Sequence, residues 1–225
     1  MNRRLFMRHA LTGLGLGCLP PAMARAASEA LSVPLGAPSA PPAPDAVMAM
    51  MGLPVKTSVG LLLERARAAL DTHSDRIALR DRIAIADFAA ASNQHRFHIV
   101  DLAAGKAVSY LVAHGLGSDP EHSGYLRSFS NEPNSQATSE GAYLTGELYD
   151  GQHGASMRLV GLDPTNNNAD IRAIVVHSAP YVSEDHVAVW GKAGRSNGCF
   201  VFAPHLIAQV LGLIGPGRLL LSAKI

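Results

Sequence analysis

Short segments with the apolar or alternating pattern of β-strands follow one another along most of the chain, and they constrain its fold more than any other feature. Turn-forming residues such as Ala104-Gly105-Lys106 and Tyr149-Asp150-Gly151 separate them. Regular alternation of strands with helices is missing, which argues against a parallel doubly wound sheet. The pattern predicts a mostly β fold, arranged as a β-sandwich or a barrel. The predicted strands are residues 83–88, 96–101, 107–114, 157–162, 171–177, 199–202 and 219–225.

A leading helix and one further short helix accompany these strands. From Ser58, a suitable N-cap, apolar residues recur at helical spacing, and the pattern ends at residues 71–75. The shorter helix covers residues 204–213, with Pro204 at a tolerated first-turn position and Gly215-Pro216-Gly217 after its end. The apolar stripe of the leading helix consists of Val59, Leu62, Leu63, Ala66, Ala69 and Leu70.

Residues 1–26 are typical of an export signal peptide. They contain four arginines and no acidic residue, and their apolar run at residues 10–19 is shorter than the ~20 residues of a membrane-spanning helix. Ala24-Arg25-Ala26 offers the small residues that a signal peptidase reads, so we expect cleavage before Ala27. An ordinary secretory signal and twin-arginine export, indicated by Arg3-Arg4-Leu5-Phe6-Met7, both agree with this segment. We therefore expect a periplasmic or cell-envelope protein with no transmembrane segment in its mature form.

The rest of the chain divides into a tether and a folded domain. Residues 27–54 are rich in proline and alanine and cannot build a core, so we expect an extended tether. Residues 55–225 hold all the predicted strands and helices. The formal net charge of the chain is +1, which gives no electrostatic case for a nucleic-acid partner.

A histidine and a cysteine stand out in the second half of the domain. His177 ends a buried predicted strand, and a glycine-containing turn, Gly194-Arg195-Ser196-Asn197-Gly198, leads into Cys199. Because Cys18 lies in the segment predicted to be removed, Cys199 is either an inert buried residue or a reactive thiol. A nearby imidazole activates a thiol by taking its proton. The pair therefore indicates nucleophilic catalysis, although each residue alone is more often structural.

The turn before Cys199 has the form of an oxyanion-binding site. A tight turn at Gly198 lets successive backbone N–H groups point at one spot, as a developing oxyanion requires. The order of histidine before cysteine disfavours the papain-like peptidases. Several histidines together with Cys199 would be candidate zinc ligands, but their spacing matches no compact motif, so we predict no metal. Those candidate ligands are His177, His186, Cys199 and His205.

These segments resemble the YkuD-type L,D-transpeptidases of bacterial cell walls. The likeness is closest to a divergent branch of murein L,D-transpeptidase catalytic domains with a Gly-Arg-Ser-x-Gly-Cys turn, matched by residues 194–199, and an Ile-Val-x-His-x-Ala-x-Tyr-Val strand end, matched by residues 174–182. With upstream blocks it covers roughly residues 60–205. Asn197 stands where the family has histidine or tryptophan, and Phe200 where the branch often has proline. Val201 and Phe202 replace the arginine and asparagine of the broader family.

The resemblance implies an L,D-transpeptidase-like β-sandwich and a covalent acyl transfer without a metal or organic cofactor. Cys199 would attack a peptidoglycan stem peptide, with His177 as the base and Ser178 or a backbone carbonyl orienting it. The resemblance further implies oxyanion or turn roles for Ser196, Asn197 and Gly198. As substrate contacts we expect Ser178, Tyr181 and Arg195, with two alternatives left open: Tyr181 pins its loop, and Arg195 stabilises the turn.

Under this reading the partners are donor and acceptor stem peptides, and the product is a cross-link. Two alternatives stay open at this point. One is a cell-wall L,D-carboxypeptidase or cysteine peptidase that hydrolyses stem peptides. The other is an inactive peptidoglycan-binding module, prompted by the departures at Asn197 and Phe200.

Overall fold

The structure is a computed structural model that describes residues 58–225. The predicted export signal (1–26), the predicted tether (27–54) and Cys18 lie outside the described residues. Within residues 58–225, no helix combines the length and the apolar character that crossing a membrane requires.

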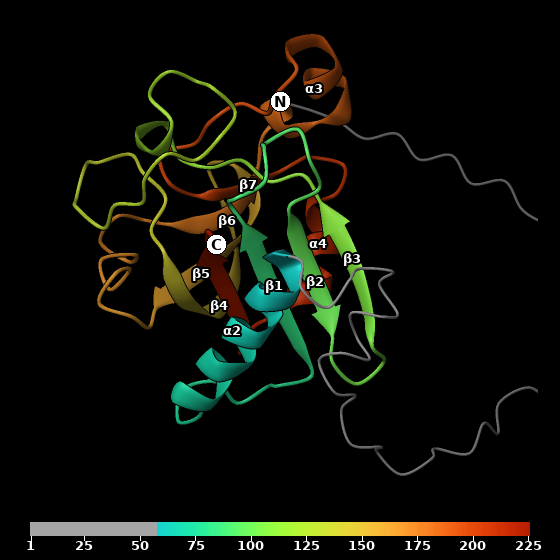
Figure 1. Ribbon diagram of the computed structural model, residues 1–225, viewed down its shortest axis with the longest axis vertical. Helices are drawn as coiled ribbons and strands as arrows, with labels where there is room; N and C mark the ends of the chain where they lie inside the picture. Colours follow the sequence, from blue (N-terminus) through green and yellow to red (C-terminus); the bar gives the residue numbers. More distant parts are fainter. Residues whose placement is uncertain (1–57) are drawn as a thin grey trace, which may run out of the picture. The chain divides into compact units, whose positions relative to one another are not determined.

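The described chain is built mostly of strands, with three α-helices, and this confirms the predicted mostly β fold (Figure 1). The strands are β1 (Arg82–Asp87), β2 (Phe97–Asp101), β3 (Lys106–Tyr110), β4 (Gly141–Gly151), β5 (Gly154–Gly161), β6 (Val175–Ser178), β7 (Phe200–Phe202) and β8 (Leu219–Ala223). The helices are α2 (Ser58–Thr72), α3 (Glu184–Trp190) and α4 (Ile207–Ile214), with 3₁₀ turns η1 (Leu116–Ser118) and η2 (Pro180–Val182).

The strands form a single sheet that curls on itself. Their order is β3-β2-β1-β8-β4-β5-β6-β7. Neighbouring strands are antiparallel except for the parallel pairs β1–β8 and β6–β7. Beyond the end of β3, Ala113 bridges to Val201 of β7, and its N–H donates to the Val201 carbonyl at 3.1 Å. Because the two ends of the strand order meet, the predicted sandwich or barrel takes the form of one curled sheet.

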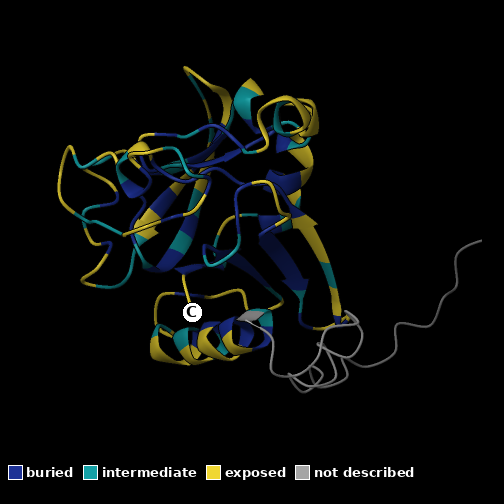
Figure 2. Ribbon diagram, turned by 45° about the horizontal axis from the view of Figure 1, so that its top comes forward, coloured by how far each residue is buried: buried dark blue, intermediate teal, exposed yellow. Residues whose placement is uncertain are grey.

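Each face of the sheet has its own hydrophobic core. Side chains alternate between the faces of a strand, so Ile83 and Ile85 of β1 join the core beneath α2, while Ala84 and Ala86 join the core that includes α4. The predicted stripe of α2 lies in the first of these cores, and Figure 2 shows the buried side of this helix facing the sheet. The leading helix was thus predicted with its correct buried face, because its stripe matches the period of an α-helix.

Aromatic rings fix the position of β7 in the core that includes α4. Phe200 packs against Tyr143 with ring centroids 5.5 Å apart, and Phe202 packs against Phe97 at 4.8 Å, both close to edge-to-face. Such pairs contribute about 1 kcal/mol each beyond the burial of their surface. Phe200 directly follows Cys199, so the packing of this ring anchors the start of β7 and the cysteine before it.

Two elements escaped the sequence prediction. The strand β4 carries internal glycines and a register shift between Thr145 and Leu148, so it has no continuous apolar pattern. The helix α3 has only seven residues and no buried one. Its signals were local: Ser183 accepts a hydrogen bond from the His186 N–H at the N-cap, and Gly191 ends the helix in a left-handed conformation.

The predicted strand 171–177 was wrong in its first half. Ile171 is 73% exposed, and Ala173 has φ +51, which a strand does not allow. Regular pairing begins only at Val175. The predicted helix 204–213 is also shorter at its start, because residues 203–206 form a turn in which the Leu206 N–H donates to the Ala203 carbonyl.

Candidate active site

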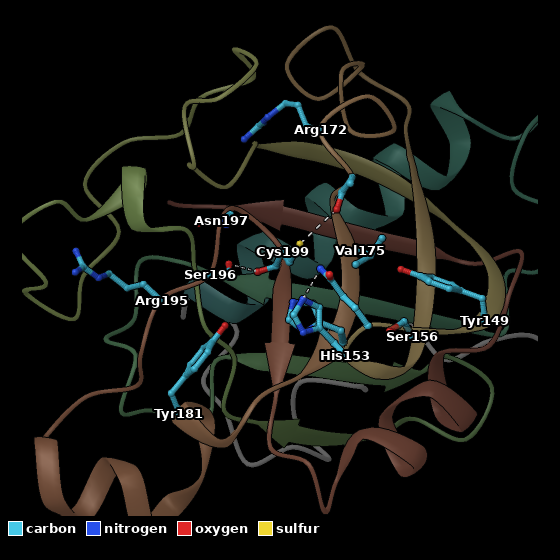
Figure 3. Close-up of a pocket in the computed structure, with 13 residues that line it drawn as sticks. Tyr149, His153, Ser156, Arg172, Val175, Tyr181, Arg195, Ser196, Asn197 and Cys199 are labelled. Atoms are coloured by element: carbon cyan, nitrogen blue, oxygen red, sulfur yellow. Dashed lines mark hydrogen bonds between the residues drawn. The ribbon is translucent and has the colours of Figure 1, made fainter.

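A polar cavity of about 340 Å³ lies where β6, the start of β7 and the β4–β5 hairpin meet (Figure 3). Both Cys199 and His177 line it. Phe200 pairs with Val176 and Val201 with His177 in the parallel β6–β7 pair. Residues two apart on a strand share a face, so this register brings the cysteine and the histidine to one side of the sheet.

The turn before Cys199 is braced by the Ser196 side chain. Its hydroxyl donates to the Cys199 carbonyl at 2.7 Å and accepts from the Gly198 N–H at 3.1 Å. The predicted role of Ser196 in the turn thus has a geometric basis. The Gly198 N–H, in contrast, was expected to serve an oxyanion and is already engaged by this hydroxyl. In the substrate-free protein this N–H therefore already has a hydrogen-bond partner.

Gly198 is required by the close approach of a second segment. Its φ is +115, and a Cβ atom there would lie 2.6 Å from the Ala137 carbonyl oxygen and 2.8 Å from Cδ1 of Ile174. A backbone carbonyl cannot move aside as a flexible side chain can, so a larger residue would displace the turn and the cysteine that follows it.

A buried polar network supports the turn from the side of the core. Arg96 is 1% exposed. Its Nη2 donates to Nδ1 of His114 at 2.7 Å, and Nε2 of His114 contacts Asp119 at 3.4 Å. Burial, aided by the charge of Arg96, lowers the pKa of His114 to about 4. The His114 carbonyl accepts the Ser196 N–H at 2.9 Å, so this network holds one end of the turn that precedes Cys199.

The Cys199 thiol is partly buried and unpaired with any other cysteine in residues 58–225. Its hydrogen bond goes to the Ala173 carbonyl, with Sγ 3.5 Å from the oxygen. Burial raises the pKa of this thiol above its usual value, while the Val175 N–H and the positive charge of Arg172 oppose that shift. Near neutral pH the thiol is therefore protonated in the free protein.

His177 is held by its Nδ1 atom, which lies 3.0 Å from the backbone carbonyl of Ser178. With Nδ1 as the donor, the neutral ring leaves Nε2 free to accept a proton. Burial lowers the pKa of His177, the Ser178 carbonyl opposes this, and the charge of His153 lowers it further. Near neutral pH the free protein therefore presents a neutral thiol and a neutral imidazole to the same cavity.

The residues predicted to contact substrate occupy different places. Tyr181 lines the cavity and packs closely on Gly194, where a Cβ atom would lie 2.6 Å from the ring. Burial is the main cause that raises the pKa of Tyr181 to about 12. Ser178 does not line the cavity and contributes its carbonyl to His177. Arg195 lines it, but Nη1 donates to the carbonyls of Asp119 and Pro120, and in Figure 3 its side chain points away from Cys199.

Two residues of the cavity wall were missed by the sequence reasoning. His153, from the β4–β5 loop, is not among the predicted site residues, yet it stacks on His177. Arg172 was placed within the predicted strand, yet its guanidinium donates to the Ser130 carbonyl at 2.8 Å, to Ser135 at 3.2 Å and to the Ala137 carbonyl. No local pattern marks either residue, because both act through partners far away in the sequence.

The residues of the rejected zinc hypothesis are not gathered in one place. Cys199 and His177 line the cavity, whereas His186 and His205 do not. Over residues 58–225, no group of three or more histidine, cysteine or carboxylate side chains is arranged to hold a metal ion.

The fold and the cavity define a class of protein: a curled mostly β domain that presents a cysteine and a histidine to one polar pocket. The family model for L,D-transpeptidase catalytic domains matches residues 58–222. The chain belongs to this family, as the resemblance of its motifs predicted.

Solved structures of similar proteins include L,D-transpeptidases from two mycobacteria. The match to the enzyme from Mycobacterium smegmatis has 14% identity and a TM-score of 0.38, covering 64% of this chain and 58% of that one. The match to the enzyme from Mycobacterium tuberculosis H37Rv has 14% identity and a TM-score of 0.37, covering 64% and 57%. The alignments thus span less than two thirds of these proteins. No curated protein matches the chain.

Proposed function

We propose that this protein is an exported L,D-transpeptidase that cross-links peptidoglycan stem peptides through an acyl-enzyme on Cys199. The observation that carries the proposal is that Cys199 and His177 line the same polar cavity. Membership of the L,D-transpeptidase catalytic domain family supports the same reaction class.

In the proposed reaction Cys199 Sγ attacks the carbonyl carbon of the third stem residue while Nε2 of His177 takes the thiol proton. The amide bond to D-alanine breaks, His177 gives its proton to the leaving amine, and a thioester remains. An amine of a second stem peptide then attacks the thioester, which forms the new amide and regenerates the thiol. Neither a metal nor an organic cofactor takes part in these steps.

The oxyanion would be stabilised by the backbone N–H of Cys199 and by Asn197. Because the Gly198 N–H is engaged by Ser196 at 3.1 Å, we assign Gly198 to the shape of the turn instead. Asn197 is exposed and lines the cavity, so its amide can reach a bound carbonyl. A single donor of this kind typically contributes about 3 kcal/mol to the transition state.

A second cavity favours transfer to an amine over hydrolysis. It measures about 300 Å³ and shares Arg172, Ala173 and Asn197 with the first. Transfer between two peptides needs one place for the donor and another for the acceptor, both within reach of the thioester. We therefore propose that the two cavities take one stem peptide each. Tyr181 and Arg195 on the wall of the first would contact the donor.

The reaction products test this proposal. Incubation of the protein with a disaccharide-tetrapeptide is expected to release D-alanine, to add the mass of the acyl group to the protein, and to yield a dimeric muropeptide. These are measured by amino-acid analysis, intact mass and liquid chromatography. Release of D-alanine with a tripeptide as sole product would instead identify a carboxypeptidase. A folded protein that binds muropeptides without releasing D-alanine would support the inactive binding module.

The proposed substrate requires the protein to reach the cell envelope. We propose that residues 1–26 direct export and that residues 27–54 tether the domain there. Amino-terminal sequencing of the protein recovered from a periplasmic fraction is expected to begin at Ala27. Replacing Arg3 and Arg4 together by lysine separates the two export routes, because only the twin-arginine route would lose the protein. Recovery of uncleaved protein in the cytoplasm alone would contradict export.

A further inference from the structure

His153 forms a face-to-face contact with the candidate base. The ring centroids of His153 and His177 are 4.3 Å apart, and the two ring planes are inclined by 19°. His153 belongs to the short loop between β4 and β5, where Gly151 pairs with Gly154. The contact therefore joins a hairpin loop to a residue of β6. Figure 3 shows His153 on the opposite side of Cys199 from Arg172.

The contact with His153 covers one face of the His177 ring, which is otherwise held only by a hydrogen bond at one edge. His177 lines the cavity and yet is only 4% exposed, while His153 itself is open to solvent. The hydrogen bond from Nδ1 of His177 to the Ser178 carbonyl fixes one edge of the imidazole. One hydrogen bond does not fix the plane of a ring, whereas a flat ring stacked on its face does.

The position of His153 is set in turn by its neighbour in the loop. The Gln152 amide donates to Nε2 of His153, with the two nitrogen atoms 3.1 Å apart. An amide nitrogen can only donate, so Nε2 of His153 is the acceptor in this bond, which holds the His153 ring in its place in the loop.

We infer that His153 is a positioning residue for acyl transfer, which holds the plane of the His177 imidazole and shields its outer face from water. The inference rests on the proposed function, in which His177 is the base. His153 transfers no proton itself in this scheme. It keeps Nε2 of His177 directed into the cavity while His177 gains and loses the proton of Cys199.

The charges around the pair give this role a measurable consequence. The other titratable or cationic residues of the cavity are Cys199, Tyr149, Tyr181, Arg172 and Arg195, and no carboxylate is among its lining residues. The charge of His153 is one of the causes that lower the pKa of His177. Loss of His153 removes both the cover and the like charge, and each change raises the pKa of His177.

Two replacements of His153 in the full chain separate the flat ring from its charge. His153→Ala is expected to lower kcat for D-alanine release by up to about 100-fold, since a misplaced catalytic group costs this much, with little change in KM. His153→Phe keeps a ring that can stack and is expected to retain most of kcat. In both variants the acid limb of kcat/KM and the NMR titration of labelled His177 are expected to move to higher pH.

A matched control is His205→Ala, which removes an exposed histidine that does not line the cavity. It is expected to change neither kcat nor the titration of His177. The inference is overturned if His153→Ala keeps the wild-type kcat, if both His153 variants lose equal activity, or if the His177 titration stays in place. If the unaltered protein releases no D-alanine, the proposed function fails. The titration of His177 still tests the contact in that case.

Discussion

Replacing Cys199 by alanine is expected to reduce D-alanine release by at least about 10⁴-fold and to abolish the acyl-enzyme, as loss of the nucleophile does in other covalent enzymes. The change removes one atom from a residue that is partly exposed. Phe200 and the Ser196 side chain, which anchor the turn, remain. The protein should therefore keep its fold, and the loss should appear in kcat.

The control for this prediction is Cys18→Ala in the uncleaved full-length chain, which removes the other cysteine and is expected to leave the activity unchanged. Circular dichroism and the melting temperature establish that the Cys199→Ala protein is folded. An activity within tenfold of the unaltered protein would show that Cys199 does not form the intermediate.

Replacing His177 by glutamine is expected to lower kcat by about 10²- to 10⁴-fold, the usual contribution of a general acid–base. The glutamine side chain can still form hydrogen bonds, but it cannot accept and release a proton as the imidazole does. The unaltered protein should lose activity as the pH falls and His177 becomes protonated. Because burial lowers the pKa of His177 from 6.5, the midpoint of this loss is expected below pH 6.5.

The measurement is kcat/KM as a function of pH for the unaltered protein and the His177→Gln variant. In the His177→Gln variant, the decrease of kcat/KM at low pH that protonation of His177 causes should be absent. His205→Gln makes the same substitution on the surface and should leave both kcat and the pH dependence unchanged. An acid limb that persists in the His177→Gln protein, with a small loss of kcat, would assign the base to another residue.

The mostly β fold and the leading helix could be predicted from the sequence because both follow from the local spacing of apolar residues. The stripe of α2 repeats every three to four residues and selects one buried face. The strands near 83–88 and 219–225 show apolar runs that match β1 and β8 closely. The elements that escaped, β4 and α3, are those in which glycine, a register shift or a lack of buried residues weakens that local signal.

By itself the sequence determined the two candidate catalytic residues. They are His177, which lies in β6, and Cys199, which follows the glycine-containing turn. The sequence also determined the family to which the chain belongs. Only the tertiary structure decided that His153 lies on His177, that the Gly198 N–H is engaged by Ser196, and that Arg172 braces the wall of the cavity. The reason is physical. A periodic pattern specifies how neighbours along the chain fold, whereas these contacts join distant segments through hairpin register and the closure of the sheet.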